Sequence, residues 1–261
     1  MTKIITIANQ KGGVGKTTTT VNLAAALAAT KRRVLLIDMD PQGNATMGSG
    51  VDKNQLRVSI CDVLLGDARI DQTIVRVEEA GYDILPANAD LTAAEVQLVT
   101  RIGREKQLSL ALETVANNYD YIFIDCPPSL NMLTVNALVA ATGVVIPMQC
   151  EYYALEGLSS LLDTIDQIRI NVNPHIKLEG LLRTMYDPRN NLANDVSAEL
   201  IQHFGDRVYR TVIPRNIRLA EAPSYGQPIM QYDRNSRGSM AYIALAGEVL
   251  RRDAKQNHYP S

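Results

Sequence analysis

Short apolar runs alternate with longer helical patterns along the whole of this 261-residue chain. Most of these runs are continuously apolar, which is typical of strands buried on both faces of a parallel sheet. Repeated strand–helix alternation requires right-handed crossover connections, and these place helices on both faces of the sheet. The sequence therefore predicts an α/β fold with a doubly wound, mostly parallel sheet.

Seven segments are expected to form strands and seven to form helices. The spacing of Thr92 and Glu95 matches a capping box, which predicts the start of one helix. The expected strands are residues 4–8, 34–37, 83–85, 121–124, 144–148, 178–183 and 208–213. The expected helices are residues 17–29, 93–99, 104–116, 134–141, 155–170, 195–204 and 240–252.

Composition excludes several classes of protein. Hydrophobic residues make up 46% of the chain and charged residues 21%, which excludes a disordered or collagen-like chain. No linker, repeat or low-complexity tract interrupts the pattern, so we expect one domain over residues 1–261 and no N-terminal helix-turn-helix module. Three scattered cysteines, the lack of a signal sequence and the lack of an apolar run of about 18 residues predict a cytoplasmic protein.

The net charge of −2 conceals an uneven distribution of charge. Residues 1–168 contain 13 Lys and Arg against 19 Asp and Glu, whereas residues 169–261 contain 13 against 9. The C-terminal third therefore carries a formal charge of +4. This excess indicates either chance scatter on a solvated surface or a surface that attracts a polyanion.

A glycine-rich segment connects the first expected strand to the first expected helix. Glycines allow backbone N–H groups to turn inward at a helix N-terminus, where they form a nest that binds phosphate groups. Lys16 is expected to reach the β- and γ-phosphates of a nucleotide, and the Thr17 hydroxyl is expected to coordinate Mg²⁺. The expected contacts in this loop are Gly12, Gly13, Val14, Gly15, Lys16, Thr17 and Thr18.

Aspartates directly follow two of the expected strands. Asp38 and Asp40 follow residues 34–37, and Asp125 follows residues 121–124. The carboxyl ends of parallel strands lie beside the phosphate loop in sheets of this kind. Asp125 has the Walker B position, and we expect it to hold Mg²⁺ through a water molecule.

The loop departs from the standard phosphate-loop pattern, because Gln10 replaces the first glycine and Lys11 lies inside the loop. This resembles the deviant Walker A motif of the family that includes MinD, the ParA/Soj partition ATPases and the nitrogenase iron protein. The resemblance implies ATP and Mg²⁺ as cofactors and a homodimer in which Lys11 crosses to the partner's nucleotide and Gly12 faces the interface. It also implies that Asp40 orients the attacking water and that Asp38 supports the metal or its loop. The expected catalytic residues are Lys11, Lys16 and Asp40.

Three further segments, residues 147–157, 211–223 and 233–238, resemble blocks of the chromosomal ParA/Soj branch. The similarity extends over nearly the whole chain, and it implies a partition ATPase with slow basal hydrolysis. It also implies that Pro214 and Asn216 contact the adenine base. A purely structural role in the core is the alternative for Pro214.

Members of this branch bind nonspecific double-stranded DNA as ATP-bound dimers. A ParB-like protein stimulates their hydrolysis of ATP, which releases the DNA. Arg189 and Arg218 match DNA-contacting positions of the family, and Arg215 and Arg237 are further candidates. A surface ion pair is the alternative for Arg189 and Arg218. The resemblance thus accounts for the basic C-terminal third and places the protein on the nucleoid.

Two other members of the family imply alternative functions. A MinD-like ATPase attaches to a membrane through its last helix, but residues 240–252 lack the lysines and aromatic anchors of a membrane helix. We expect their apolar stripe to pack on the sheet instead. An iron protein binds a metal cluster through cysteines, but Cys126 has no second cysteine at the required spacing. We therefore expect Cys126 to be a buried thiol.

Overall fold

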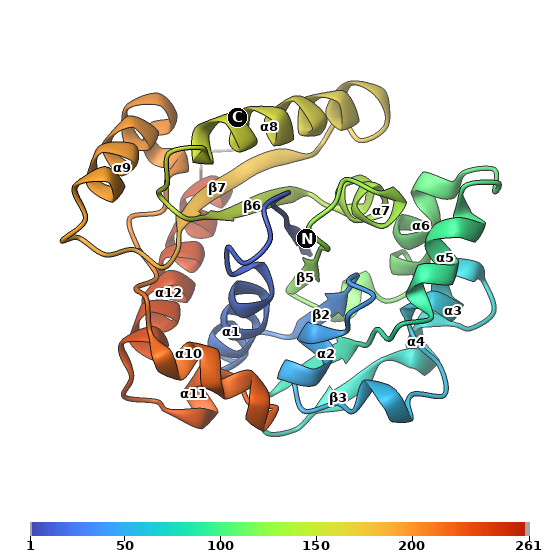
Figure 1. The fold of residues 1–261 in the computed structure, drawn as a ribbon. Helices are drawn as coiled ribbons and strands as arrows, with labels where there is room; N and C mark the ends of the chain where they lie inside the picture. Colours follow the sequence, from blue (N-terminus) through green and yellow to red (C-terminus); the bar gives the residue numbers. More distant parts are fainter. Residues whose placement is uncertain (1, 259–261) are drawn as a thin grey trace.

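A seven-stranded sheet forms the centre of the computed structural model, which describes residues 2–258 and the side chains up to Lys255 (Figure 1). The strands are β1 (Lys3–Ile7), β2 (Val34–Asp38), β3 (Val75–Val77), β4 (Tyr82–Leu85), β5 (Tyr121–Asp125), β6 (Gly143–Met148) and β7 (Lys177–Arg183). Their order is β3-β4-β2-β5-β1-β6-β7, and only β3 runs antiparallel to its neighbour. The predicted α/β fold with a mostly parallel sheet is confirmed.

Helices cover both faces of this sheet (Figure 1). They are α1 (Lys16–Ala28), α2 (Asn44–Gly48), α3 (Ile60–Leu65), α4 (Ile70–Thr73), α5 (Leu91–Leu98), α6 (Gln107–Leu112), α7 (Met132–Ala140), α8 (Ala154–Asn171), α9 (Asn191–Phe204), α10 (Ile217–Glu221), α11 (Ile229–Tyr232) and α12 (Arg237–His258). On one face α1 and α12 share a core that includes Leu27 and Tyr242. On the other face α3, α5, α6, α7, α8 and α9 share a core that includes Leu64 and Leu161. Both faces are therefore buried, which explains why the strands are continuously apolar.

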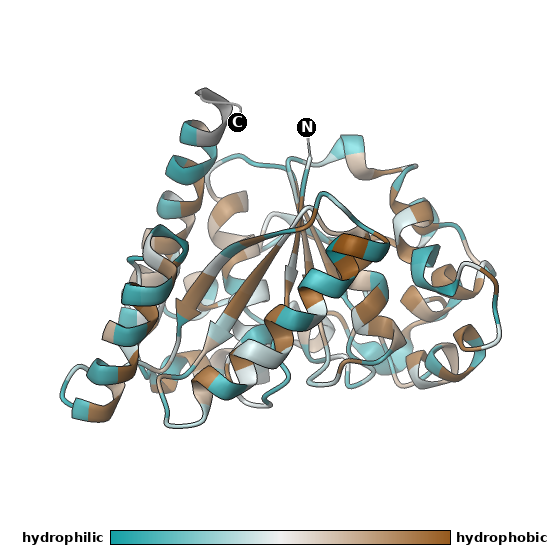
Figure 2. Ribbon diagram, turned by 90° about the horizontal axis from the view of Figure 1, so that it is seen from above, coloured by the Kyte–Doolittle hydropathy of each residue, from teal (hydrophilic) through white to brown (hydrophobic). Residues whose placement is uncertain are grey.

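The parallel strands give the sheet two different ends. We call the end at which β2 and β5 finish with Asp38 and Asp125 the carboxyl end, and the end at which β1 begins with Lys3 the amino end. α12 begins at Arg237 near the carboxyl end and runs alongside the sheet to the amino end (Figure 2). There Asp253 forms an ion pair with Lys3. One helix therefore connects the two ends of the molecule.

The strand predicted over residues 208–213 does not form. This segment makes only isolated bridges to β7 and the residues after it. Arg183 Nη2 donates to the backbone carbonyls of Tyr209 and Arg210, and Glu248 accepts from the backbone N–H groups of Arg210 and Thr211. Side chains thus satisfy backbone groups that a neighbouring strand would otherwise bond, and the segment needs no ladder.

The capping box predicted at Thr92 is also wrong. α5 begins at Leu91, two residues before the predicted start at residue 93, so Thr92 lies inside its first turn. A capping box does occur at the start of α3, where the Ser59 hydroxyl accepts from the backbone of Cys61 and the Asp62 carboxylate accepts from the backbone of Ser59. Asp62 supplies the third position of this box, where Glu or Gln is the usual residue.

Several short elements were not predicted from the sequence, and two predicted helices, α6 and α9, have different bounds. β3 has only three residues, with the charged Arg76 at its centre, so its apolar pattern is weak. α6 is shorter than residues 104–116, because a 3₁₀ turn at Arg104–Lys106 precedes it. α9 begins at Asn191, before the predicted start, since the Asn190 side chain caps it. The remaining unpredicted helices are α2, α3, α4, α10 and α11.

Candidate active site

The loop between β1 and α1 lies at the carboxyl end of the sheet. Gly13 and Gly15 have φ values of +73° and +86°, which favour glycine because side chains rarely adopt this conformation. Gly15 is the N-cap of α1, so the backbone N–H groups of the loop lie at a helix N-terminus. A cavity of about 390 Å³ borders this loop. Its lining residues are Gly12, Gly13, Gly15, Lys16, Thr17, Thr18, Asp40, Gln42, Asn44, Pro128 and Met185.

Lys16 brings a buried positive charge to this cavity. Only 7% of its surface is exposed, and its Nζ donates a hydrogen bond to the carbonyl of Lys11 at 3.1 Å. Burial lowers the pKa of Lys16, and the negative charges of Asp125 and Asp40 act in the opposite direction. Because a buried ammonium group is stabilised by a nearby anion, this position favours a phosphate group in the cavity.

Thr17 and Asp125 meet at the base of the site. The Thr17 hydroxyl donates to Asp125 Oδ2 at 2.7 Å, and the Thr20 hydroxyl donates to Oδ1 at 2.9 Å. Asp125 is fully buried, and this burial, together with the nearby charge of Asp38, raises the pKa of its carboxyl. A divalent cation would offset the cost of this buried charge, and hydroxyl and carboxylate oxygens are ligands that Mg²⁺ accepts. The residues present therefore fit Mg²⁺.

The described residues contain no group of three or more His, Cys, Asp or Glu side chains that could hold a metal by itself. This is compatible with Mg²⁺, which usually keeps several waters and binds phosphate oxygens together with one or two protein ligands. Cys126 is 1% exposed and is a free thiol, and burial raises its pKa well above the ordinary value. Its surroundings are those of the buried thiol expected from the sequence.

Asp38 holds the loop that carries Asp40. Its Oδ2 accepts from the backbone N–H and the hydroxyl of Thr46, each at 2.8 Å, and its Oδ1 accepts from the backbone N–H of Asp40 at 3.1 Å. Asp40 in turn lines the cavity and accepts from the backbone N–H of Gln42 at 2.9 Å. Of the two roles expected for Asp38, these bonds favour support of the loop over direct metal binding.

Lys11 and Gly12 are exposed at the outer side of the loop. The Lys11 ammonium forms an ion pair with Glu151 of its own chain, and both side chains are about half exposed. Lys11 is not among the residues that line the cavity of its own chain, and a Cβ at Gly12 would meet no atom within 4 Å. Both positions can therefore contact a second molecule.

Pro214 and Asn216 do not line the cavity. Pro214 forms an isolated bridge with Tyr186, and the Asn216 side chain caps α10 by accepting from the backbone N–H of Leu219 at 3.2 Å. The residue that does reach the cavity from this side is Met185, which precedes Tyr186. Because its bridge partner Tyr186 directly follows the lining residue Met185, Pro214 lies close to the cavity wall without forming it. The contacts of Pro214 and Asn216 described above are structural ones.

Four lining residues were not predicted from the sequence. They are Gln42, Asn44, Pro128 and Met185. Each follows the carboxyl end of a strand, and this position is the signal that could have identified them. Met185 carries a second structural signal, because its φ of +48° is rare for a residue other than glycine.

Arg189 and Arg218 lie in exposed ion pairs. Arg189 is 87% exposed and binds Asp187 through Nε at 2.9 Å and Nη2 at 2.7 Å, which lowers the pKa of Asp187 to about 2. Arg218 pairs with Glu221 at 2.8 Å and with Asp233 at 3.5 Å. These are the ion pairs expected as the alternative to DNA contacts, although both guanidinium groups remain accessible. The other two candidates, Arg215 and Arg237, are exposed and form no ion pair within residues 2–258.

Comparison with known proteins places this chain in a family. The profile of a family described as an AAA domain matches residues 2–178. The chain is 54% identical to the sporulation initiation inhibitor protein Soj of Bacillus subtilis, and the match covers 95% of this chain and 98% of Soj. It is 50% identical to the chromosome partitioning protein ParA of Caulobacter vibrioides, over 96% of this chain and 95% of ParA.

A solved structure from Mycobacterium smegmatis has the same fold, with a TM-score of 0.85 and 40% sequence identity over 97% of this chain and 96% of that chain. That protein is described as cobyrinic acid a,c-diamide synthase with bound ADP and magnesium. Within the described residues, no helix of the present chain is long and apolar enough to cross a membrane. The matches over nearly the full length show that the chain belongs to the AAA domain family and, within it, to the ParA/Soj family of chromosome partitioning proteins.

Proposed function

We propose that this chain is a DNA partition ATPase, a single domain over residues 1–261 that binds ATP and Mg²⁺ at the candidate active site. The observation that carries this proposal is the contact of the Thr17 hydroxyl with Asp125, beside the buried Lys16 and the glycine loop. The near-full-length similarity to chromosome partitioning proteins supports the same function, in the cytoplasm and on the nucleoid.

Each residue of the site has a proposed role in hydrolysis. The bound nucleotide and Mg²⁺ would supply the reacting phosphate group and neutralise its charge. Lys16 would face the β- and γ-phosphates, and Thr17 would hold the metal directly. Asp125 would hold it through water, and Asp38 would keep the loop of Asp40 in place for water activation. The backbone N–H groups of Gly12, Gly13, Val14, Gly15 and Thr18 would bind the phosphate oxygens.

Hydrolysis is proposed to require a homodimer. Lys11 is exposed and lies outside the cavity lining, and Gly12 has open space at its Cβ position, so a second subunit that covers the cavity would receive the Lys11 ammonium at its own nucleotide. Lys11 would first leave Glu151, an exposed partner whose ion pair contributes little to stability. The ATP-bound dimer would bind nonspecific duplex DNA through Arg189 and Arg218, and a ParB-like protein would stimulate hydrolysis and release.

Gly12→Val tests the dimer without disturbing the fold, because a side chain there meets nothing in its own chain. We expect this variant still to bind ATP in calorimetry and to remain monomeric with ATP and Mg²⁺ in light scattering. Lys11→Ala should show the same loss of dimers together with a loss of hydrolysis. Normal ATP-dependent dimers in both variants would contradict the proposal.

The structure favours DNA over a membrane as the proposed binding partner. The apolar stripe of α12 is buried against α1 and the sheet, with Tyr242, Leu245, Ala246 and Val249 each at most 3% exposed. A helix that buries its apolar stripe in the core does not offer it to lipid. We expect the ATP-bound protein to sediment with DNA and not with anionic liposomes, whereas the opposite result would favour a MinD-like function.

A further inference from the structure

A cavity of about 720 Å³ at the amino end of the sheet has an excess of positive charge. It lies between the start of β7, the 3₁₀ turn Gly205–Arg207 and the last turns of α12. Six basic and three acidic side chains line it, which leaves a formal charge of +3. The basic residues are Lys177, Arg207, Arg210, Arg251, Arg252 and Lys255.

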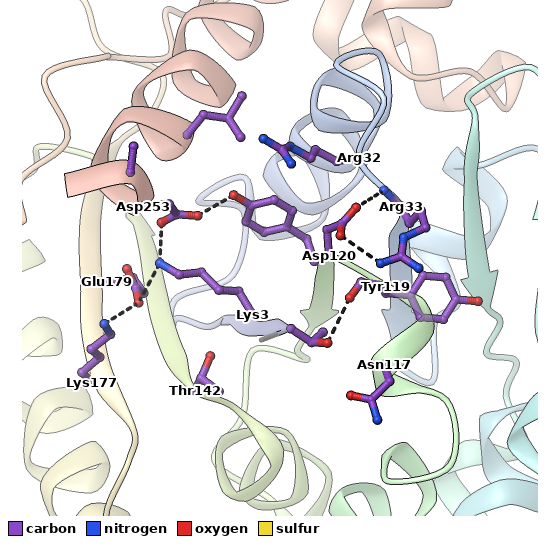
Figure 3. A pocket seen from close by; sticks show the side chains of 14 residues that line it. Lys3, Arg32, Arg33, Asn117, Tyr119, Asp120, Thr142, Lys177, Glu179 and Asp253 are labelled. Atoms are coloured by element: carbon purple, nitrogen blue, oxygen red, sulfur yellow. Dashed lines mark hydrogen bonds and ion pairs between the residues drawn. The ribbon is translucent and has the colours of Figure 1, made fainter. Parts of the chain in front are cut away.

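A neighbouring cavity of about 790 Å³, which shares Lys177 and Glu179 with the first, neutralises most of its own charge (Figure 3). Lys3 points to Asp253 and to Glu179, and Lys177 also binds Glu179 at 3.4 Å. Arg33 binds Asp120 on the other side of the same cavity. Of the lysines and arginines that line this cavity, Arg32 alone has no ion pair with a residue that the structure describes. In this cavity, every lysine and arginine except Arg32 is matched with a carboxylate.

The 720 Å³ cavity is different. Arg252 is paired with Glu248 at 2.8 Å and stacks over a tyrosine ring, but four other basic side chains have no hydrogen bond or ion pair with any residue the structure describes. Glu248 cannot serve them, because its oxygens already accept from two backbone N–H groups. Asp206 is the one carboxylate of this cavity that has no ion pair within residues 2–258. The four unmatched basic residues are Arg207, Arg210, Arg251 and Lys255, and all are exposed.

The exposure of these four residues decides what kind of ligand fits. A site for a small molecule buries most of its ligand and directs a few fixed polar groups at it. Here the buried Glu248 and the partly buried Arg252 bind each other, and the unmatched charges are exposed. A long polyanion needs no enclosure, because each of its charges binds an exposed cation and releases a counterion.

We propose that Arg207, Arg210, Arg251 and Lys255 form a second contact surface for the phosphate backbone of duplex DNA. We call these four residues the amino-end surface. This inference rests on the proposed function, which supplies DNA as the polyanion. It adds a surface separate from Arg189 and Arg218, which lie on elements at the carboxyl end.

The distance between the two surfaces follows from α12. Its 22 residues have a length of roughly 33 Å between the carboxyl and amino ends of the sheet. The amino-end surface is therefore remote from Lys11 and Gly12 and is complete in a single subunit. It should bind DNA weakly without nucleotide, and an ATP-bound dimer would carry two copies, which raises the apparent affinity.

The test replaces all four residues in the full chain by glutamine, as Arg207→Gln, Arg210→Gln, Arg251→Gln and Lys255→Gln. Duplex binding is measured by fluorescence anisotropy at several salt concentrations, with and without ATP and Mg²⁺. The matched control removes four exposed charges elsewhere, as Lys31→Gln, Arg57→Gln, Lys106→Gln and Arg169→Gln. We expect the log–log salt slope of the first variant to fall by roughly 0.9 for each DNA phosphate that is no longer neutralised, and that of the control to stay near the parent value.

The possible failures are distinguishable. If the parent does not bind duplex DNA under any condition, the proposed function fails. If the parent binds and the four-residue variant keeps its slope, or the control loses as much as that variant, the amino-end surface is wrong and the proposed function stands. A polyglutamate peptide gives a further outcome. If the parent binds this peptide even in the presence of excess duplex, and the four-residue variant does not, the surface would be assigned to an acidic protein instead. Unchanged ATP-dependent dimerisation and hydrolysis in the variant would show that it folds normally.

Discussion

At the carboxyl end of the sheet, the carboxylates beside the candidate site are buried and accept short hydrogen bonds from hydroxyl and backbone donors, whereas at the amino end several basic side chains are exposed and unmatched. Asp38 and Asp125 are 0% exposed, and their oxygens are occupied by hydroxyl and backbone donors. Arg207 and Arg251 are exposed without partners in the described range. Transfer of a phosphoryl group requires catalytic groups that are held in place, and burial with satisfied hydrogen bonds holds them. Attraction of a polymer requires charge alone.

The largest effect is expected at the buried end. Lys16→Ala removes the ammonium that faces the cavity, and no other lining residue carries a positive charge. ATP affinity should fall by about 100-fold or more, since a hydrogen bond to a charged group contributes about 1.5–3 kcal/mol and this group would face two phosphates. Calorimetry checks this, with the exposed Lys31→Ala as the control. Retained affinity in Lys16→Ala would contradict the assignment of the loop.

A smaller effect is expected at the arginines that are both accessible and paired. Arg189→Glu with Arg218→Glu should weaken ATP-dependent DNA binding to the level that the amino-end surface alone provides, while dimerisation and basal hydrolysis survive. The salt slope should fall by roughly 0.9 for each phosphate that the variant no longer neutralises, with little dependence on base sequence. Alanine versions should show a weaker defect, because they remove attraction without adding repulsion. If the variant with both glutamate substitutions binds duplex DNA like the wild type, the DNA contacts lie elsewhere. The amino-end surface would then be the remaining candidate.

The coupling of buried carboxylates predicts a pH effect on stability. Burial raises the pKa of Asp125, so the nucleotide-free folded chain holds a proton that the unfolded chain has already lost. Its free energy of unfolding should therefore fall as the pH rises from about 5 to 8. Asp125→Asn should remove this loss and be more stable than the parent at the upper pH by about 1–2 kcal/mol.

Thermal unfolding in the absence of Mg²⁺ measures this difference, with the exposed Asp163→Asn as the control. The advantage of Asp125→Asn should shrink as the pH falls, because the parent carboxyl then takes up its proton. Parallel pH profiles for the parent and Asp125→Asn would show that the buried charge does not control stability.

The smallest effect on DNA affinity is expected when an arginine that is paired in the structure loses its carboxylate partner. Asp187→Asn removes the carboxylate that binds Arg189 and should raise duplex affinity by about twofold, because an exposed ion pair competes only weakly with DNA. Anisotropy measurements at low salt check this result. A decrease in affinity would indicate that Asp187 instead orients Arg189 toward the DNA.

The carboxyl end could be predicted from the sequence because its parts are local patterns joined by one rule. The glycine loop, Thr17 and Asp125 can each be recognised within a few residues, and parallel strands bring their carboxyl ends together. The partners across the site obey no such rule. Glu151 lies 140 residues from Lys11, and only the fold shows that the two form an ion pair.

The amino end was less predictable for the same reason. The charge excess of residues 169–261 was visible, but which of these cations lack partners depends on the fold. Residues 208–213 have the β-branched and aromatic pattern of a strand, yet Arg183 and Glu248, which lie before and after them in the chain, satisfy their backbone instead. Hydrogen bonds between distant segments decide whether a pattern becomes a strand.

Residues 208–213 also cover one border of the sheet. β7 is the outermost strand on its side of the sheet, and such a strand normally presents free backbone groups to another chain. Here Leu181 of β7 is bridged to Val208, and the Arg183 side chain donates hydrogen bonds to the backbone carbonyls of Tyr209 and Arg210. On the opposite side the outermost strand, β3, has only three residues and carries Arg76. The sheet is therefore blunted against strand addition at both borders, and this would let copies in the proposed DNA-bound state gather on one duplex without joining sheet to sheet into fibres.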